Sequence, residues 1–266
     1  MSNFYQRGIF GLIYVVLFLS AILISEFSYV AYATLLGFFC LLEFTRIINF
    51  KYTIVYLIYG MLVYLIIIED FKFLVTPILM LSLASSIVLM YQLFVNKGFV
   101  FQRNLLRFVI SVRYIIFSSI FIILLPFLNG EYRPHLIIGI LVMMWANDSF
   151  AYLVGKNFGK RKLFPSVSPK KTVEGFIGGF VFTLVAAACI HYFNKDLDLI
   201  SWLVIGTIMS TIGTIGDLIE SKFKRIAEVK DSGTLIPGHG GFFDRLDSLL
   251  FAAPFVYLYV HHIAIF

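Results

Sequence analysis

The sequence predicts an all-α polytopic membrane protein, and three observations favour this class. Hydrophobic residues make up 60% of the 266 residues and charged residues only 14%, whereas soluble domains carry roughly 25% charged residues. The hydrophobic residues gather in segments close to the length that a helix needs to cross a bilayer, about 20 residues. Phe and Tyr number 30 and 15, and they suit lipid-facing surfaces and the membrane–water interface.

Nine apolar segments are candidate membrane spans. The third is short, and the ninth carries two histidines near its end. We expect helices at Tyr5–Ile24, Tyr29–Ile48, Thr53–Ile68, Phe73–Phe94, Val109–Leu128, His135–Val154, Val173–Phe193, Leu199–Leu218 and Leu246–Ile265.

The distribution of basic residues predicts the orientation of these helices. With the N-terminus in the cytoplasm, 17 of the 21 Lys and Arg residues fall in cytoplasmic segments, three fall in outer loops and Arg113 falls within a helix. This asymmetry follows the positive-inside rule. We therefore expect a cytoplasmic N-terminus, an outer C-terminus, and cytoplasmic segments at 155–172 and 219–245.

The chain is predicted to form one integral membrane domain over residues 1–266. We expect residues 1–130 to supply scaffold helices and residues 131–266 the catalytic helices and cytoplasmic loops, because the polar motifs lie in the second half. The net charge is +6, and the charges lie between apolar runs. The expected partners are therefore the lipid bilayer, phosphates and anionic headgroups rather than nucleic acid.

Two carboxylates stand within predicted helices, where a charged group near the centre costs at least about 2.5 kcal/mol. Glu43 lies three residues before Arg46 near a helix end, and we interpret it as a structural ion pair at the membrane interface. Asp148 stands between Asn147 and Ser149 in an apolar helix. That run favours a contact with a metal or a nucleotide over a buried hydrogen bond between helices.

A third carboxylate, Asp217, ends a helix that approaches the cytoplasmic side. Gly213 and Gly216 precede it at a spacing of three and allow another backbone to come close. Glu220 and Ser221 follow on the same helix face. Because a basic segment comes next, we interpret Asp217 as a ligand of a divalent cation rather than as a capped helix end facing water.

The polar segment Ser221–Asp247 combines three groups that suit phosphate chemistry. Its Lys and Arg side chains can hold phosphates. The glycines of Pro237–Gly241 let backbone amides approach an anion, and His239 among them contacts substrate phosphate or shapes the loop. Asp244 and Asp247 lie three apart and share a helix face. Hard oxygen ligands beside phosphate-binding cations indicate magnesium, with a second metal ion left open.

Several of these positions follow one order and spacing: Ser221, Lys224, Arg225, Lys230, Asp231, His239, Gly240, Gly241, Asp244, Arg245 and Asp247. At these residues the sequence closely resembles the phosphatidate cytidylyltransferase (CDP-diacylglycerol synthase) family and shows no departure from its signature. The run Ser168–Gly175 is similar to the family's second cytoplasmic motif. The resemblance is strong from about Trp145 onward and rests on hydropathy alone before that residue.

The resemblance implies a reaction in which CTP and phosphatidic acid give CDP-diacylglycerol and pyrophosphate. It also implies a homodimer in the cell (inner or plasma) membrane, with the active site facing the cytoplasm. The residues agree with this reaction, because an anionic lipid phosphate needs no strong base. What it needs is charge neutralisation and alignment of two polyanions.

We assign roles as hypotheses. Asp217 and Asp244 bind magnesium, and Asp148 and Asp247 lie nearby as ligands or orienting groups. With Lys224 and Arg225 these four acids form the expected catalytic set. The expected substrate-binding residues are Ser168, Lys170, Lys171, Ser221, Lys230, Asp231, His239, Gly240, Gly241 and Arg245.

Three alternatives stay open at this point. A lipid or polyprenol kinase that uses CTP would share a similar C-terminal region, although the complete signature argues against it. A transporter or channel would use intramembrane acids as an ion pathway, but the acids cluster with the cations on one side. A purely structural scaffold would not need a His-Gly-Gly loop beside paired aspartates.

Overall fold

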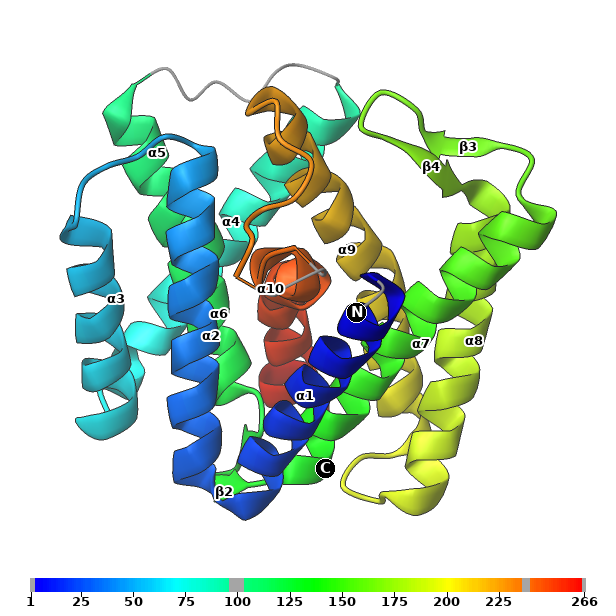
Figure 1. The fold of residues 1–266 in the computed structure, drawn as a ribbon. Coiled ribbons are helices and arrows are strands. Elements are labelled where there is room, and N and C mark those ends of the chain that lie inside the picture. Colours follow the sequence, from blue (N-terminus) through cyan, green and yellow to red (C-terminus); the bar gives the residue numbers. More distant parts are fainter. Residues whose placement is uncertain (1–2, 96–102, 236–239, 265–266) are drawn as a thin grey trace.

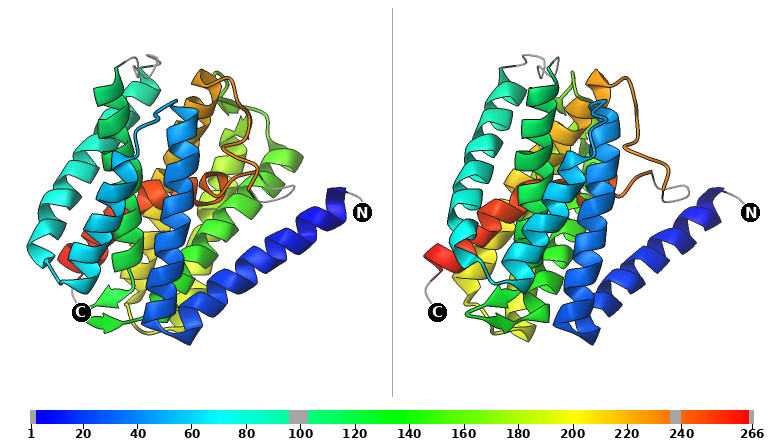
Figure 2. Two further views of the ribbon diagram at one scale, coloured as in Figure 1. Left: turned by 60° about the vertical axis from the view of Figure 1, so that its left-hand side comes forward. Right: turned by 90° about the vertical axis from the view of Figure 1, so that its left-hand side faces the viewer.

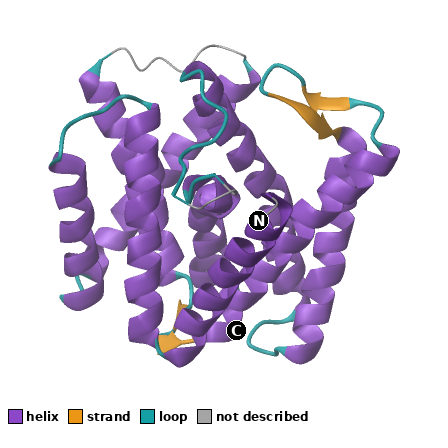
Figure 3. Ribbon diagram, viewed as in Figure 1, coloured by secondary structure: helices purple, strands orange, loops and turns teal. Residues whose placement is uncertain are grey.

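The computed structural model describes residues 3–95, 103–235 and 240–264, with side chains described from residue 11 onward. The described chain is a bundle of helices with two small antiparallel hairpins at its ends (Figures 1 and 3). The helical segments before residue 130 are α1 Asn3–Ile24, α2 Glu26–Ile47, α3 Ile54–Val63, η1 Tyr64–Ile68, η2 Lys72–Leu74, α4 Val75–Phe94, α5 Asn104–Ile110, η3 Ser111–Ile116 and α6 Phe117–Leu124.

The second half of the chain holds both of its longest helices. The helical segments are α7 Pro134–Phe158, α8 Val173–Phe193, α9 Leu199–Ile226, α10 Phe243–Leu258 and η4 Tyr259–Ile263. Two hairpins complete the described structure. In the first, β1 Phe127–Leu128 pairs with β2 Glu131–Tyr132; in the second, β3 Lys162–Phe164 pairs with β4 Ser168–Thr172, with Lys162 opposite Thr172.

Seven helical stretches among the described residues are long and apolar enough to cross a membrane. Two shorter apolar stretches, Gly11–Ile24 and Ile54–Ile68, coincide with the first and third predicted spans. This arrangement is consistent with an all-α polytopic membrane protein. The number of nine crossings and the placement of the two termini stay predictions.

The predicted ends of two C-terminal helices were wrong. We expected α9 to end at Leu218, yet it continues to Ile226, and α10 begins at Phe243 rather than Leu246. The last two turns of α9 carry Glu220 and Lys222, which are buried against neighbouring helices. Hydropathy places a boundary where charge begins, so it misses a helix whose charged residues are buried inside the protein.

Local signals explain several helix ends. The side chain of Thr172 accepts a hydrogen bond from the Gly175 amide and caps α8, and Asp198 caps α9 through the Ser201 amide. Such side chains satisfy amide groups that the first helical turn leaves without a partner. Upstream, α6 ends at Leu124 because Pro126 cannot continue a helix.

Helix α10 occupies the middle of the bundle. It is seen end-on in Figure 1 and along its length in Figure 2, and it packs against α9, α6, α2 and α4. Its residues 249–253 are fully buried. A helix that is apolar on every side belongs inside a protein. Helices from both halves of the chain therefore hold the helix that carries Asp244 and Asp247.

One end of the bundle carries the β3–β4 hairpin and the segment that follows α9, and we call it the basic end (Figure 1). The opposite end carries the β1–β2 hairpin and the turn between α8 and α9. Helix α1 runs obliquely, and its N-terminal end stands away from the bundle in both views of Figure 2.

Candidate active site

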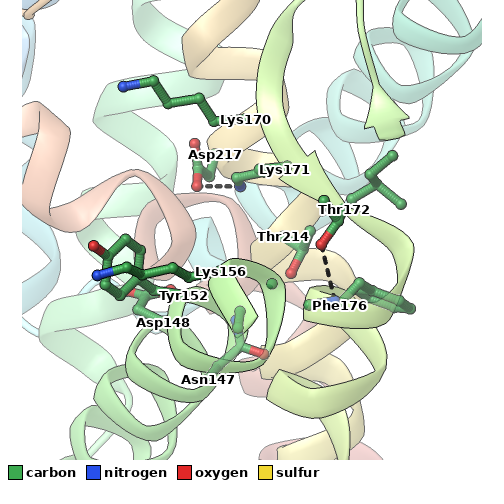
Figure 4. Close-up of a pocket in the computed structure, with 14 residues that line it drawn as sticks. Asn147, Asp148, Tyr152, Lys156, Lys170, Lys171, Thr172, Phe176, Thr214 and Asp217 are labelled. Carbon is green, nitrogen blue, oxygen red and sulfur yellow. Dashed lines mark hydrogen bonds and ion pairs between the residues drawn. The ribbon is translucent and has the colours of Figure 1, made fainter. Parts of the chain in front are cut away.

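A pocket of about 420 Å³ opens between α7, α8, β4 and α9 near the basic end (Figure 4). Asp148 and Asn147 line it from α7, Lys170 and Lys171 from β4, and Asp217 from α9. Asp148 is exposed to the pocket. The pocket therefore brings together four residues that the sequence predicted for the site, from three separate segments.

An ion pair links β4 to α9 inside this pocket. The Lys171 ammonium pairs with Oδ2 of Asp217, and Ser221 donates to Oδ1 of the same carboxylate at 3.3 Å. Burial alone would lower the pKa of Lys171. The carboxylate of Asp217 outweighs that effect, with help from Asp247 and Asp148, so the pKa of Lys171 lies above its ordinary value. Lys171 is therefore a cation at neutral pH.

Helices α9 and α10 meet closely just behind Asp217. A Cβ atom on Gly216 would lie 2.4 Å from Cβ of Phe251 and 3.0 Å from the Asp247 carbonyl oxygen. Gly213 faces Ser248 of α10 in the same seam, so the predicted close approach of a second backbone is confirmed.

This seam gathers a group of carboxylates. Oxygens of Asp217, Glu220 and Asp247 all lie within 4.8 Å of one another. Glu220 is fully buried, and its Oε2 lies 2.6 Å from the ammonium of Lys224. A cluster of converging hard oxygen donors fits a divalent cation such as magnesium.

Lys224 joins this cluster to the start of α10. Its ammonium lies 2.6 Å from Oε2 of Glu220 and 2.7 Å from Oδ1 of Asp244. The other oxygen of Asp244 accepts hydrogen bonds from the amides of Ser232 (2.9 Å) and Gly241 (2.8 Å). In this arrangement Asp244 binds the Lys224 ammonium and the backbone amides of Ser232 and Gly241. Asp217, in contrast, belongs to the acidic cluster with Glu220 and Asp247. The magnesium role predicted for Asp244 stays a prediction.

The remaining predicted residues lie around this centre. Arg225 donates from Nε to the Val167 carbonyl at 3.4 Å and thereby contacts the β3–β4 hairpin, where Ser168 begins β4. Lys230 and Asp231 are exposed in the segment after α9, and Arg245 is exposed in the first turn of α10. Gly240 has a φ of +84°, a conformation that favours glycine, and Gly241 follows it. His239 falls outside the described residues.

The interpretation of Glu43 as an interface ion pair with Arg46 was wrong. Glu43 is fully buried, whereas Arg46, three residues further along the helix, is exposed. Instead, the Glu43 carboxylate accepts hydrogen bonds from Ser232 Oγ at 2.9 Å and from the amides of Phe242 at 3.2 Å and Phe243 at 2.9 Å. The C-terminal end of α2 therefore packs against the polar segment Ser221–Asp247 rather than facing lipid headgroups.

Sequence reasoning also left out residues that the structure places at the site. Glu220 was noted on the face of Asp217 but was not assigned a role. Asn147 lines the pocket with a buried side-chain oxygen that accepts no hydrogen bond from the described chain. Lys156, one turn beyond Tyr152, lines the same pocket. Helical spacing could have found two of these positions, because Lys156 lies eight residues after Asp148 in α7 and Glu220 lies three residues after Asp217 in α9.

The α9–α10 seam gives a first testable prediction. The Gly216→Ala substitution places a methyl group against Phe251, and such overpacking costs about 1–3 kcal/mol. We expect a lower unfolding temperature for the purified protein in detergent. Gly60→Ala is the matched control, because a Cβ there meets nothing within 4 Å. Equal stability of the two variants would contradict the close packing of this seam.

A family model described as the cytidylyltransferase family matches residues 5–263. A Bacillus subtilis protein named phosphatidate cytidylyltransferase is 51% identical over 117 residues, which is 44% of each chain. A protein of that name from Staphylococcus aureus is 47% identical over 122 residues, 45% of this chain and 46% of its own. Each matched stretch thus spans less than half of the relative. Because the family model covers nearly the whole sequence, this chain belongs to the cytidylyltransferase family.

Proposed function

We propose that the protein transfers a cytidylyl group from CTP to phosphatidic acid, giving CDP-diacylglycerol and pyrophosphate for phospholipid synthesis. The observation that carries this proposal is the pocket in which Lys170 and Lys171 lie beside Asp148 and Asp217, next to a buried acidic cluster. Family membership and the names of the two relatives support the same reaction.

The chemistry matches these groups. An oxygen of the lipid phosphate attacks the α-phosphorus of CTP, a new P–O bond forms, and the bond to the bridging oxygen of the β-phosphate breaks. Pyrophosphate leaves with that electron pair. The attacking oxygen is already anionic, so no general base is required. Lys171, held as a cation by Asp217, and Lys170 can neutralise phosphate charge as the two anions approach.

Asp217, Glu220 and Asp247 would hold a magnesium ion, because their carboxylate oxygens converge to within 4.8 Å of one another. When bound, the ion supplies positive charge for the phosphates of CTP and the leaving pyrophosphate. Lys171 pairs with Asp217, and Lys224 pairs with Glu220. Through these ion pairs the two lysines orient the carboxylates around which the substrates would be positioned.

The lipid substrate reaches the pocket from the side of the bundle. Tyr152 and Phe176 line the pocket, and exposed apolar side chains continue from it along α7 and α8, among them Leu153, Ile177 and Val181. Acyl chains can lie on this apolar surface while the phosphate enters the polar pocket. The charge therefore need not cross the hydrocarbon region.

In this proposal the protein is a multi-pass protein of the cell membrane, with its basic end in the cytoplasm, and it acts as a homodimer. With Cys40 and the exposed Cys189 replaced by serine, a cysteine at the exposed position of Lys230 should react with a membrane-impermeant maleimide in inverted vesicles but not in intact cells. Labelling in intact cells but not in inverted vesicles would place the basic end outside the cell.

Chemical cross-linking in the native membrane tests the homodimer and should capture a pair of chains.

One assay tests the reaction. Purified protein in mixed micelles is given phosphatidic acid, magnesium and CTP labelled either in cytidine or at the γ-phosphate, with ATP and GTP as controls. We expect the cytidine label to enter the lipid, the γ label to leave as pyrophosphate, and turnover to stop with chelator. Entry of the γ label alone would identify a CTP-dependent kinase and overturn the proposal.

A further inference from the structure

A buried carboxylate from the N-terminal half of the chain reaches the segment that leads into α10. Glu43 lies near the end of α2 and is fully buried. It accepts hydrogen bonds from Ser232 Oγ and from the amides of Phe242 and Phe243. Among the described residues its carboxylate forms no ion pair. Hydrogen bonds from this segment are therefore what stabilises its carboxylate inside the protein.

Two of these donors belong to the N-terminus of α10. Phe242 is the residue that precedes the helix, and Phe243 is its first residue. The first amides of a helix have no partner within the helix and carry the positive end of its dipole. Glu43 thus caps α10 from another helix. Phe39, one turn earlier on α2, stacks on Phe242 with ring centres 4.8 Å apart.

The backbone of the segment approaches Glu43 so closely that side chains are excluded. A Cβ on Gly233 would lie 2.4 Å from Oε1 of Glu43, and a Cβ on Gly241 would lie 2.2 Å from Oε2. Both sides of the segment, before and after residues 236–239, therefore close on the same carboxylate. Gly241 also lies within the signature that led to the family.

Ser232 connects this carboxylate to the acids of the site. Its hydroxyl donates to Glu43 and accepts from the Asp244 amide at 3.3 Å, while its own amide donates to the Asp244 carboxylate. Asp244 in turn pairs with Lys224, which pairs with Glu220. A continuous set of contacts runs from α2 to the acidic cluster.

We propose that Glu43 is a positioning residue for the reaction: it fixes Ser232, Gly233, Gly241 and the start of α10, so that Asp244 and Lys224 are held against the acidic cluster. This inference rests on the proposed function for its catalytic consequence. Its structural part, the capture of the segment by α2, stands on the contacts alone.

The test compares Glu43→Gln with Glu26→Gln, an exposed glutamate on the same helix. In Glu43→Gln the new side-chain amide would turn a donor toward a backbone amide, so one hydrogen bond is lost. We expect kcat to fall about 10- to 100-fold, the range for residues that orient a site. Hydrogen exchange should become faster in peptides covering 231–244 and stay unchanged in α7 and α8. Glu26→Gln should match the wild type in both.

A double-mutant cycle with Ser232→Ala separates positioning from general destabilisation. If Glu43 acts through Ser232, the two losses in kcat are not additive, because either change breaks the same set of contacts. Additive losses, wild-type exchange in 231–244, or faster exchange throughout the bundle would overturn the proposal. Glu43→Asp, one methylene shorter, serves the same measurements where Glu43→Gln is not recovered as folded protein. Absence of CTP turnover in the wild type would refute the proposed reaction yet leave the exchange result to be judged alone.

Discussion

Asp217→Asn is expected to reduce CTP-dependent transfer to phosphatidic acid by on the order of 100- to 1,000-fold, the range for removing one group that stabilises charge in a transition state. Asp217 has two connections that the amide cannot replace. It pairs with Lys171 across the pocket and contributes oxygens to the cluster with Glu220 and Asp247. The measurement is kcat/KM for CTP as magnesium is varied, with the variant shown to be folded.

The control for this substitution is Asp70→Asn. Asp70 is exposed in a turn at the opposite end of the bundle, where it pairs with Lys72 at 3.2 Å. Its φ of 55° is a conformation that asparagine adopts readily, so we expect wild-type activity and stability. Near-normal magnesium-dependent turnover in folded Asp217→Asn would remove Asp217 from the metal site and from the mechanism.

Much of the fold follows from hydropathy, and the exceptions share one cause. Each of the nine predicted spans overlaps helical structure, because a long apolar run has few alternatives in lipid, although the fifth span ends in strand β1 rather than in helix. The end of α9 could not be found in this way. Glu220, Lys222 and Lys224 look like the start of a water-exposed loop, yet they pack against α10 and α4. Their burial depends on partners that lie far away in the sequence.

The candidate site shows the same difference between what local sequence predicts and what depends on distant partners. Asp217 and Asp148 were predicted from local patterns and Lys171 from the family resemblance of Ser168–Gly175, and the structure brings all three to one pocket. The sequence could not predict which acid pairs with a lysine and which joins the acidic cluster, because the spacing of residues does not show which carboxylate faces a lysine. Glu43 was misinterpreted for the same reason. Its nearest candidate partner in sequence, Arg46, is exposed whereas Glu43 is buried, and its actual partners lie about 190 to 200 residues further on.

Lys224→Met is expected to destabilise the protein and to abolish its activity. The Met side chain fills nearly the same volume but leaves the carboxylates of Glu220 and Asp244 facing each other without the cation between them. Lys224 is only 12% exposed, so water cannot replace its charge. Removing one partner from such a buried pair typically costs about 3–5 kcal/mol. The unfolding temperature in detergent and CTP turnover give the two readouts.

Lys224→Arg is the informative companion, because it keeps the positive charge while changing its shape. A guanidinium between Glu220 and Asp244 should recover most of the stability, and activity should recover less, since the wider head group shifts Asp244 relative to the acidic cluster. Lys230→Met, at an exposed position beyond α9, controls for loss of charge and should leave the unfolding temperature unchanged. If Lys224→Met were as stable as Lys230→Met, the two carboxylates would have to be neutralised by something other than Lys224, and the ion pairs that join α9 to α10 would not hold the site together.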